Sequence, residues 1–210
     1  MRVKPGLVAA ELIMLLLLAA AAGWLIMTHG TVSVAGEAAR AEPLIAGAFS
    51  PPHEAPDFLL EGSNGADVAL STYRGKMVLL TFGFTNCAAV CPTTLATLAQ
   101  ARKKLGQAAN GVQVLYVTVD PDRDSPAKMK EYLAAFDPSF IGATGTPEVL
   151  AAVRRKYGVT ATRQGSGPDY AMAHTSSIFL IDRTGKLRAL MPFGHDADDF
   201  VHDINYLSAH

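Results

Sequence analysis

The chain lacks an excess of charge of either sign, because 18 Lys and Arg residues balance 19 Asp and Glu residues. It also lacks clustered basic residues interleaved with aromatic ones. These two absences argue against nucleic acid as a partner. Cysteine is scarce, since the 210 residues include only two, and both fall within one short segment. A chain of this length has room for one soluble domain with extensions.

Residues 1–27 predict an N-terminal transmembrane anchor or an uncleaved signal. Arg2 and Lys4 precede an apolar run at residues 7–27, and roughly 20 apolar residues span a hydrocarbon core. The positive charges predict a cytoplasmic N-terminus and a soluble domain on the extracytoplasmic side, where disulfides are permitted. A cleaved signal peptide is the alternative, with a small-residue site at residues 33–35, although the run is long for one. No cysteine follows the run closely, which argues against a lipid-anchored form.

The rest of the chain predicts a linker and then one α/β domain. Residues 28–55 lack periodicity and are rich in Ala, Gly, Pro and Ser, as linkers are. The domain, expected over residues 56–210, opens with an Asn-Gly pair at residues 64–65 between apolar runs, which predicts an N-terminal β-hairpin. Apolar residues at both alternating positions predict buried core strands at residues 77–84 and 112–119.

Helix signals separate the predicted strands. Helices are expected after the N-cap residues Ser125, Thr146 and Asp196, and a second hairpin is expected near residues 178–190. Strand, helix and strand in this order predict a central mixed sheet with helices on its faces. A right-handed crossover makes the two core strands parallel, so their carboxyl ends meet at one edge, where ligands usually bind.

The two cysteines, Cys87 and Cys91, follow the first core strand. Pro92, directly after Cys91, is a preferred first residue of a helix. Cys91 is therefore expected at a helix N-terminus, where the positive end of the helix dipole lowers the pKa of a thiol. Cys87 lies one turn earlier if the turn is helix-like, with the two Cβ atoms roughly 5–6 Å apart. Such a pair can share a metal ion or form a disulfide, and inert or structural thiols are the alternative.

A third candidate comes from a distant part of the chain. If the strand at residues 178–181 runs antiparallel to the core strands, it begins at the sheet edge that carries the cysteines. The topology then brings the loop with His174 opposite Cys87 and Cys91. A lone histidine before a strand is usually a hydrogen-bonded structural residue, so it is the cysteine motif that favours a ligand role.

Three segments together resemble the Sco/SenC family. They are TNCAAVCP at residues 85–92, VDPDRD at residues 119–124 and DYAMAHT at residues 169–175. The resemblance covers residues 55–208 and implies a thioredoxin-like fold behind a single N-terminal membrane helix. It also implies a metallochaperone that delivers copper to the dinuclear copper site of cytochrome c oxidase during assembly of that enzyme.

Carried over by position, the resemblance implies copper ligation by the sulfurs of Cys87 and Cys91 and the imidazole of His174. Asp120 matches an acidic position near the family's site, without an assigned role. Ala88 departs from the family, in which many members have proline after the first cysteine, but this change removes no ligand. The implied partners are the copper-site subunit of cytochrome c oxidase, other copper chaperones and thioredoxin-like reductants.

The donor set itself favours copper. Two thiolates and an imidazole are soft ligands that suit Cu(I), and Cu(II) stands high in the affinity series of divalent metals. Three donors leave an open position, as a protein that hands its metal onward requires. Zinc, with water or Asp120 as the fourth ligand, is the alternative. Zinc is disfavoured because no side chain stands out as the general base of a zinc hydrolase.

The main rival function is thiol–disulfide exchange by Cys87 and Cys91 as a redox-active pair. The sequence therefore leaves open whether the protein is an enzyme. Two features weigh against exchange as the main activity. The spacer has three residues where thioredoxins have two, and Ser176 stands where thioredoxin-like proteins carry a cis-proline. A thiol peroxidase, which needs a low-pKa thiol and a resolving partner, is the least favoured alternative.

Overall fold

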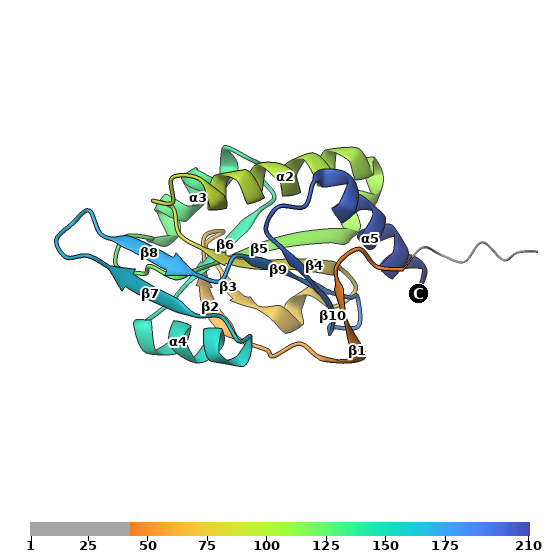
Figure 1. The fold of residues 1–210 in the computed structure, drawn as a ribbon, viewed down its shortest axis with the longest axis horizontal. Helices are drawn as coiled ribbons and strands as arrows, with labels where there is room; N and C mark the ends of the chain where they lie inside the picture. Colours follow the sequence, from red (N-terminus) through yellow and green to blue (C-terminus); the bar gives the residue numbers. More distant parts are fainter. Residues whose placement is uncertain (1–42) are drawn as a thin grey trace, which may run out of the picture. The chain divides into compact units, whose positions relative to one another are not determined.

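The computed structural model describes residues 43–210, which form the folded domain. The expected anchor at residues 1–27 and most of the expected linker lie outside the described residues. Within residues 43–210, no helix is both long and apolar enough to cross a membrane. The α/β class expected from the sequence is confirmed, since strands and helices alternate through most of this part of the chain (Figure 1).

Within the described residues, eight strands form one mixed sheet. In chain order they are β1 (Gly47–Glu54), β2 (Leu59–Gly62), β3 (Asp67–Ala69), β4 (Met77–Gly83), β5 (Val112–Thr118), β6 (Ile141–Thr144), β9 (Ser177–Ile181) and β10 (Lys186–Pro192). Their spatial order is β1-β10-β9-β4-β5-β6-β2-β3. The central pair, β4 and β5, is parallel and buried throughout, as its apolar runs predict. The two expected hairpins, β2–β3 and β9–β10, are confirmed, and β9 runs antiparallel to β4.

Helices cover both faces of this sheet (Figure 1). They are α2 (Val90–Leu105), α3 (Pro126–Ala134), α4 (Pro147–Lys156) and α5 (Ala197–Ala209), with the short 3-10 helices η1 (Leu70–Tyr73) and η2 (Gly106–Gly111). α2 packs against α5, and Figure 1 shows α4 on the opposite side of the sheet from α2. Three helices begin where the sequence predicts. The Ser125 and Thr146 side chains each accept a backbone N–H from the first turn that follows, and Asp196 forms a capping box with Asp199.

β1 corrects the predicted start of the domain. The sequence pattern predicts a linker at residues 28–55, yet Gly47–Glu54 pairs antiparallel with β10. This edge strand is mostly exposed and contains two prolines, so it has no apolar alternation by which to recognise it. The buried carboxylate of Asp203 in α5 holds the preceding segment, since it accepts the backbone N–H groups of Ile45 and Ala46, each at 2.8 Å. The folded domain therefore begins earlier than expected.

A separate two-stranded ribbon is the feature that the sequence pattern did not predict. It consists of β7 (Ala161–Gln164) and β8 (Ala171–His174), and Figure 1 shows it extending from one end of the main sheet. Gly165 and Gly167, with φ of 87° and 83°, form its turn in a conformation that only glycine adopts without strain. Because β8 ends only a few residues before β9, the ribbon returns the chain to the sheet edge at which α2 begins.

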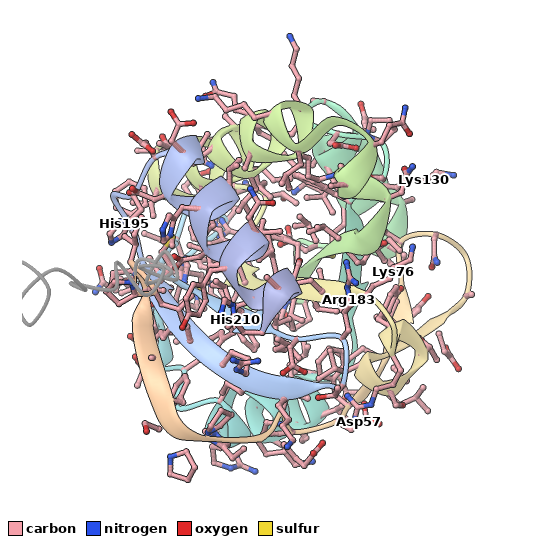
Figure 2. The ribbon with its side chains drawn as sticks, turned by 90° about the vertical axis from the view of Figure 1, so that its right-hand side faces the viewer. Asp57, Lys76, Lys130, Arg183, His195 and His210 are labelled. Carbon is pink, nitrogen blue, oxygen red and sulfur yellow. The ribbon has the colours of Figure 1, made fainter. Side chains whose placement is uncertain are left out.

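Histidines that belong to no sequence motif have local partners near α5. Figure 2 shows His195 and His210 towards the two ends of that helix. The Nδ1 atom of His195 lies 2.8 Å from the carboxylate of Asp199, and the Nδ1 atom of His210 lies 2.8 Å from the carbonyl oxygen of Tyr206. These contacts fit structural or surface roles and supply matched controls for experiments on His174.

Candidate metal centre

The two cysteines lie where β4 passes into α2. Cys91 is in the first turn of α2, and Cys87 is in the turn before it. The backbone N–H of Cys87 donates to the carbonyl oxygen of Phe84 at 3.3 Å, and that of Cys91 donates to the Sγ atom of Cys87 at 3.4 Å. Both side chains are free thiols, with Cys91 buried and Cys87 partly exposed. The short spacer thus places both sulfurs at the start of one helix.

The two thiols have opposite pKa shifts. Burial raises the pKa of Cys91 to about 12. Burial alone would also raise the pKa of Cys87, but hydrogen bonds from the backbone N–H groups of Cys91, Ala89 and Val90 outweigh it, and the pKa is lowered. The prediction that the helix N-terminus lowers the pKa of Cys91 is therefore wrong. The first N–H groups of the helix stabilise the Cys87 thiolate instead. For Cys91, the free-energy cost of burying a thiolate away from water exceeds the stabilisation that the helix dipole provides.

His174 lies at the end of β8 and faces the helix start. Its Nε2 atom is 3.6 Å from the Sγ atom of Cys91. Its Nδ1 atom is 2.9 Å from the carbonyl oxygen of Thr175, which can only accept, so Nδ1 carries the proton and Nε2 presents a lone pair. Burial lowers the pKa of His174 and favours this neutral form. The ring packs edge-on against Phe84, with ring centroids 5.8 Å apart.

The spacing of these donors fits two ligands of one ion. Bonds of the lengths known for Cys and His at zinc, in tetrahedral to trigonal geometry, would put sulfur and nitrogen roughly 3.5–3.8 Å apart. The Cys91–His174 separation of 3.6 Å falls in this range. In residues 43–210, however, no three His, Cys, Asp or Glu side chains are already grouped to hold a metal. A three-donor site therefore requires a change at Cys87, whose sulfur now accepts the Cys91 N–H.

Asp120 is buried at the same sheet edge but is occupied by protein partners. One carboxylate oxygen accepts the Tyr170 hydroxyl, and the other accepts Nε of Arg123 at 2.5 Å. The guanidinium groups of Arg123 and Arg163 both stack on the Tyr170 ring, each 3.6 Å from its centroid. These contacts hold the segment that leads into β8 and so support the position of His174. Zinc ligation by Asp120 would break one of these hydrogen bonds.

Asp124 holds the turn that carries Cys87, a role that no sequence motif predicts. Its carboxylate is fully buried and accepts the backbone N–H of Thr85 at 3.0 Å and the Thr85 hydroxyl at 2.5 Å. The Thr118 hydroxyl donates to it at 2.8 Å, and the ammonium of Lys128 lies 3.9 Å away. Lys128 also donates to the side chain of Asn86 at 2.7 Å, one residue before the first cysteine.

Residues 120–124, here called the acidic loop, therefore contact both donor-bearing segments. Asp120 and Arg123 hold the approach to His174, and Asp124 holds the approach to Cys87. The signal in the sequence was the position of this charged run directly after a core strand, at the edge where ligands usually bind. That position did not predict which of the two carboxylates, Asp120 or Asp124, contacts the segment with His174 and which contacts the segment with Cys87.

Known proteins match this domain over nearly its whole length. The family model described as SCO1/SenC matches residues 47–209. Among curated proteins, the SCO2-like protein of Rickettsia felis is 35% identical over 133 residues, which cover 62% of this chain and 65% of that protein. The chain thus spans less than two thirds of the length of this relative.

Solved structures share the architecture. ScoI of Bradyrhizobium japonicum, solved with copper bound, is 34% identical, with a TM-score of 0.69 over 74% of this chain and 99% of that chain. BsSco, described as a member of the Sco family of cytochrome c oxidase assembly proteins, is 25% identical, with a TM-score of 0.61 over 75% of this chain and 95% of that chain. The thioredoxin-like α/β fold expected for the domain is thereby confirmed.

Proposed function

The chain belongs to the SCO1/SenC family, and from this premise we propose that its folded domain is a copper metallochaperone. It binds copper through the sulfurs of Cys87 and Cys91 and the imidazole of His174. It delivers the ion to the dinuclear copper site of cytochrome c oxidase during assembly of that enzyme. The copper-bound ScoI structure and the description of BsSco as an oxidase assembly protein support this proposal.

A single observation carries the proposal, the 3.6 Å between the Cys91 sulfur and the His174 Nε2 atom. A sulfur and a neutral imidazole nitrogen, with a second sulfur at the same helix start, form a soft donor set suited to Cu(I). Three protein donors leave a coordination position for a donor of the recipient. The ion can then pass between the two proteins while it stays ligated.

Replacing His174 with Ala is expected to weaken Cu(I) binding about a hundredfold, since one of three donors is lost, which corresponds to about 2.7 kcal/mol. The His210→Ala variant removes an imidazole that contacts Tyr206 of its own helix, and it should bind as the wild type does. Competition against a chromophoric Cu(I) chelator, without oxygen and with the cysteines reduced, measures both affinities. Equal losses in the two variants would contradict the assignment of His174.

Copper affinity is expected to rise with pH. Near neutrality Cys91 is protonated, because its pKa is about 12, whereas the hydrogen bonds from the helix N–H groups lower the pKa of Cys87. Binding therefore releases the Cys91 proton, and the affinity should increase at least about tenfold per unit between about pH 7 and pH 9. Below the pKa of Cys87 a second proton competes and the dependence steepens. An affinity that does not change over that range would show that Cys91 does not bind as a thiolate.

Thiol–disulfide exchange is the second candidate, favoured by a partly exposed low-pKa thiol beside a buried protonated one. The Cys87 thiolate would attack a substrate disulfide and release one substrate thiolate. The Cys91 thiol would then pass its proton to the departing substrate sulfur as it attacks the Cys87 sulfur, which releases the second substrate thiol and leaves a Cys87–Cys91 disulfide. A thioredoxin-like reductant would regenerate the thiols, just as another copper chaperone would supply copper in the first proposal.

One pair of assays separates the two candidates. Reduced metal-free protein is mixed with the oxidised copper-site subunit of cytochrome c oxidase, and copper-loaded protein is mixed with the reduced subunit. Fast disulfide reduction without copper transfer would establish the reductant and reject the chaperone. Copper transfer with slow disulfide reduction would establish the chaperone and reject the reductant.

We also propose that residues 1–27 anchor the protein in a membrane, with the domain on the extracytoplasmic side. Arg2 and Lys4 before the apolar run support this orientation. Protease added to intact spheroplasts should degrade the domain, and alkaline carbonate should leave the full-length chain in the membrane pellet. A protected domain or a carbonate-soluble full-length chain would contradict the proposal.

A further inference from the structure

The guanidinium of Arg123 contacts both segments that carry the proposed ligands. On one side, its Nη1 atom donates to the carbonyl oxygen of Tyr170 at 2.9 Å, in the segment that leads into β8. On the other side, its central carbon lies over the Phe84 ring, 5.9 Å from the ring centroid. Phe84 directly follows β4, and its carbonyl oxygen accepts the backbone N–H of Cys87 at 3.3 Å. One side chain therefore joins the two segments.

Phe84 continues this line of contacts from Arg123 to the imidazole of His174. The Phe84 ring is buried and packs edge-on against the imidazole, with ring centroids 5.8 Å apart. The guanidinium lies within the roughly 6 Å at which a cation attracts an aromatic face. Because the ring lies against both groups, a shift of the guanidinium would move the ring and with it the support of the imidazole.

Arg123 is itself held in one orientation. Its Nε atom donates to the Asp120 carboxylate at 2.5 Å, and its guanidinium stacks on the Tyr170 ring, 3.6 Å from the centroid. Its Nη2 atom is buried and has no hydrogen-bond partner within residues 43–210. A buried N–H group without an acceptor is costly, so the guanidinium gives up one hydrogen bond to lie against the two rings.

We propose that Arg123 is a positioning residue that acts through Phe84 and sets the place of the His174 imidazole relative to the cysteine-bearing turn. The inference rests on the proposed function, in which that imidazole binds copper, and deepens it. The role requires a planar guanidinium, which stacks on a ring while it donates to a carboxylate and a carbonyl oxygen. A lysine ammonium at this position keeps the positive charge but has no plane to stack and no fixed fork of donors.

Arg102 provides a matched control. Its Nε atom donates to the Asp137 carboxylate at 3.0 Å, and its Nη1 atom donates to the carbonyl oxygen of Ala109 at 2.8 Å. Its side chain is 13% exposed, against 17% for Arg123. It also donates to the carbonyl oxygen of Val112, the first residue of β5, so it lies at the edge of the sheet opposite the cysteines. Lysine at either position therefore breaks the same kinds of hydrogen bonds, but only at Arg123 does it disturb the proposed site.

The Arg123→Lys variant is expected to bind Cu(I) about tenfold more weakly, as is usual when a residue that orients a metal ligand is lost. In its Cu(II) form, the nitrogen hyperfine coupling of the imidazole should be weaker in the electron paramagnetic resonance spectrum. In reduced, metal-free protein, the nuclear Overhauser effect between the ring protons of Phe84 and His174 should weaken. The Arg102→Lys variant should match the wild type in all three measurements, even where its melting temperature falls.

Unchanged affinity and spectra in Arg123→Lys would overturn the inference, and so would equal changes in the two lysine variants. A lower melting temperature with unchanged spectra would leave Arg123 a structural role alone. If Arg123→Lys does not fold, Phe84→Leu decides the question, because it removes the ring and leaves the hydrogen bonds of Arg123 in place. It should weaken Cu(I) binding by a similar factor, and undiminished binding would contradict the inference.

The metal-free measurement separates this inference from the proposed function. A wild type that binds no copper would reject the proposed function. The Overhauser effect between Phe84 and His174 would then still test the positioning role, since it needs no metal. Its loss in Arg123→Lys alone would support the role, and its persistence would refute it.

Discussion

Replacing both Cys87 and Cys91 with Ser is expected to abolish measurable Cu(I) binding while the domain stays folded. Serine hydroxyls are hard donors that keep their protons near neutrality, so the site loses two of its three soft ligands. The affinity should fall by more than about a thousandfold, or about 4 kcal/mol. The chelator competition used for His174 measures the loss, and circular dichroism checks that the fold is retained.

The matched control is Met172→Leu. Met172 carries a thioether two residues before His174 and packs against the core, so its sulfur fills space and is not expected to bind the ion. This variant should keep the wild-type affinity. Undiminished binding in the double serine variant would reject the proposed site outright, and a large loss in Met172→Leu would add a ligand to it.

Replacing Asp124 with Ala is expected to destabilise the domain by about 3 kcal/mol, because it leaves the Thr85 N–H and the Thr118 hydroxyl without their buried acceptor. Copper affinity should fall as well, since the turn that carries Cys87 loses its main attachment. Urea unfolding followed by fluorescence measures the stability. Chelator competition, carried out where both proteins are folded, measures the affinity.

Asp122, exposed in the same acidic loop, supplies the control for this experiment. Asp122→Ala should change the free energy of unfolding by no more than about 0.5 kcal/mol, as is usual for surface substitutions. Similar effects of the two substitutions would mean that loop charge, and not the buried hydrogen bonds, supports the turn. A destabilised Asp124→Ala protein with undiminished copper affinity would show that the turn does not set the position of Cys87.

The sequence predicted the meeting of distant segments better than it predicted local electrostatics. Parallel core strands must end at one edge, so the approach of His174 to the cysteines followed from chain topology and is now seen as a 3.6 Å contact with Cys91. The order of the pKa values of Cys87 and Cys91 did not follow from chain topology. It depends on which sulfur the helix N–H groups reach and which one the core covers, and both are properties of the folded packing.

Strands that are largely exposed to solvent were also hard to predict from the sequence. β1 is an edge strand with little buried surface, and its partner β10 lies more than a hundred residues away, so no local pattern announces the pairing. The ribbon formed by β7 and β8 is short and largely exposed, and only its glycines marked a turn. Asp124 gained its role from Thr85, a neighbour that becomes adjacent only on folding.

The acidic loop makes one kind of loss-of-function substitution expected in this protein. The carboxylates of Asp120 and Asp124, four residues apart, hold the two segments that carry the proposed ligands, although each forms its hydrogen bonds with protein groups. A substitution in the acidic loop would move the sulfur of Cys87 away from the imidazole nitrogen of His174, while the apolar core of the sheet kept its packing. Such a protein would fold and retain all three proposed donor atoms, yet it would fail to bind copper at the proposed site.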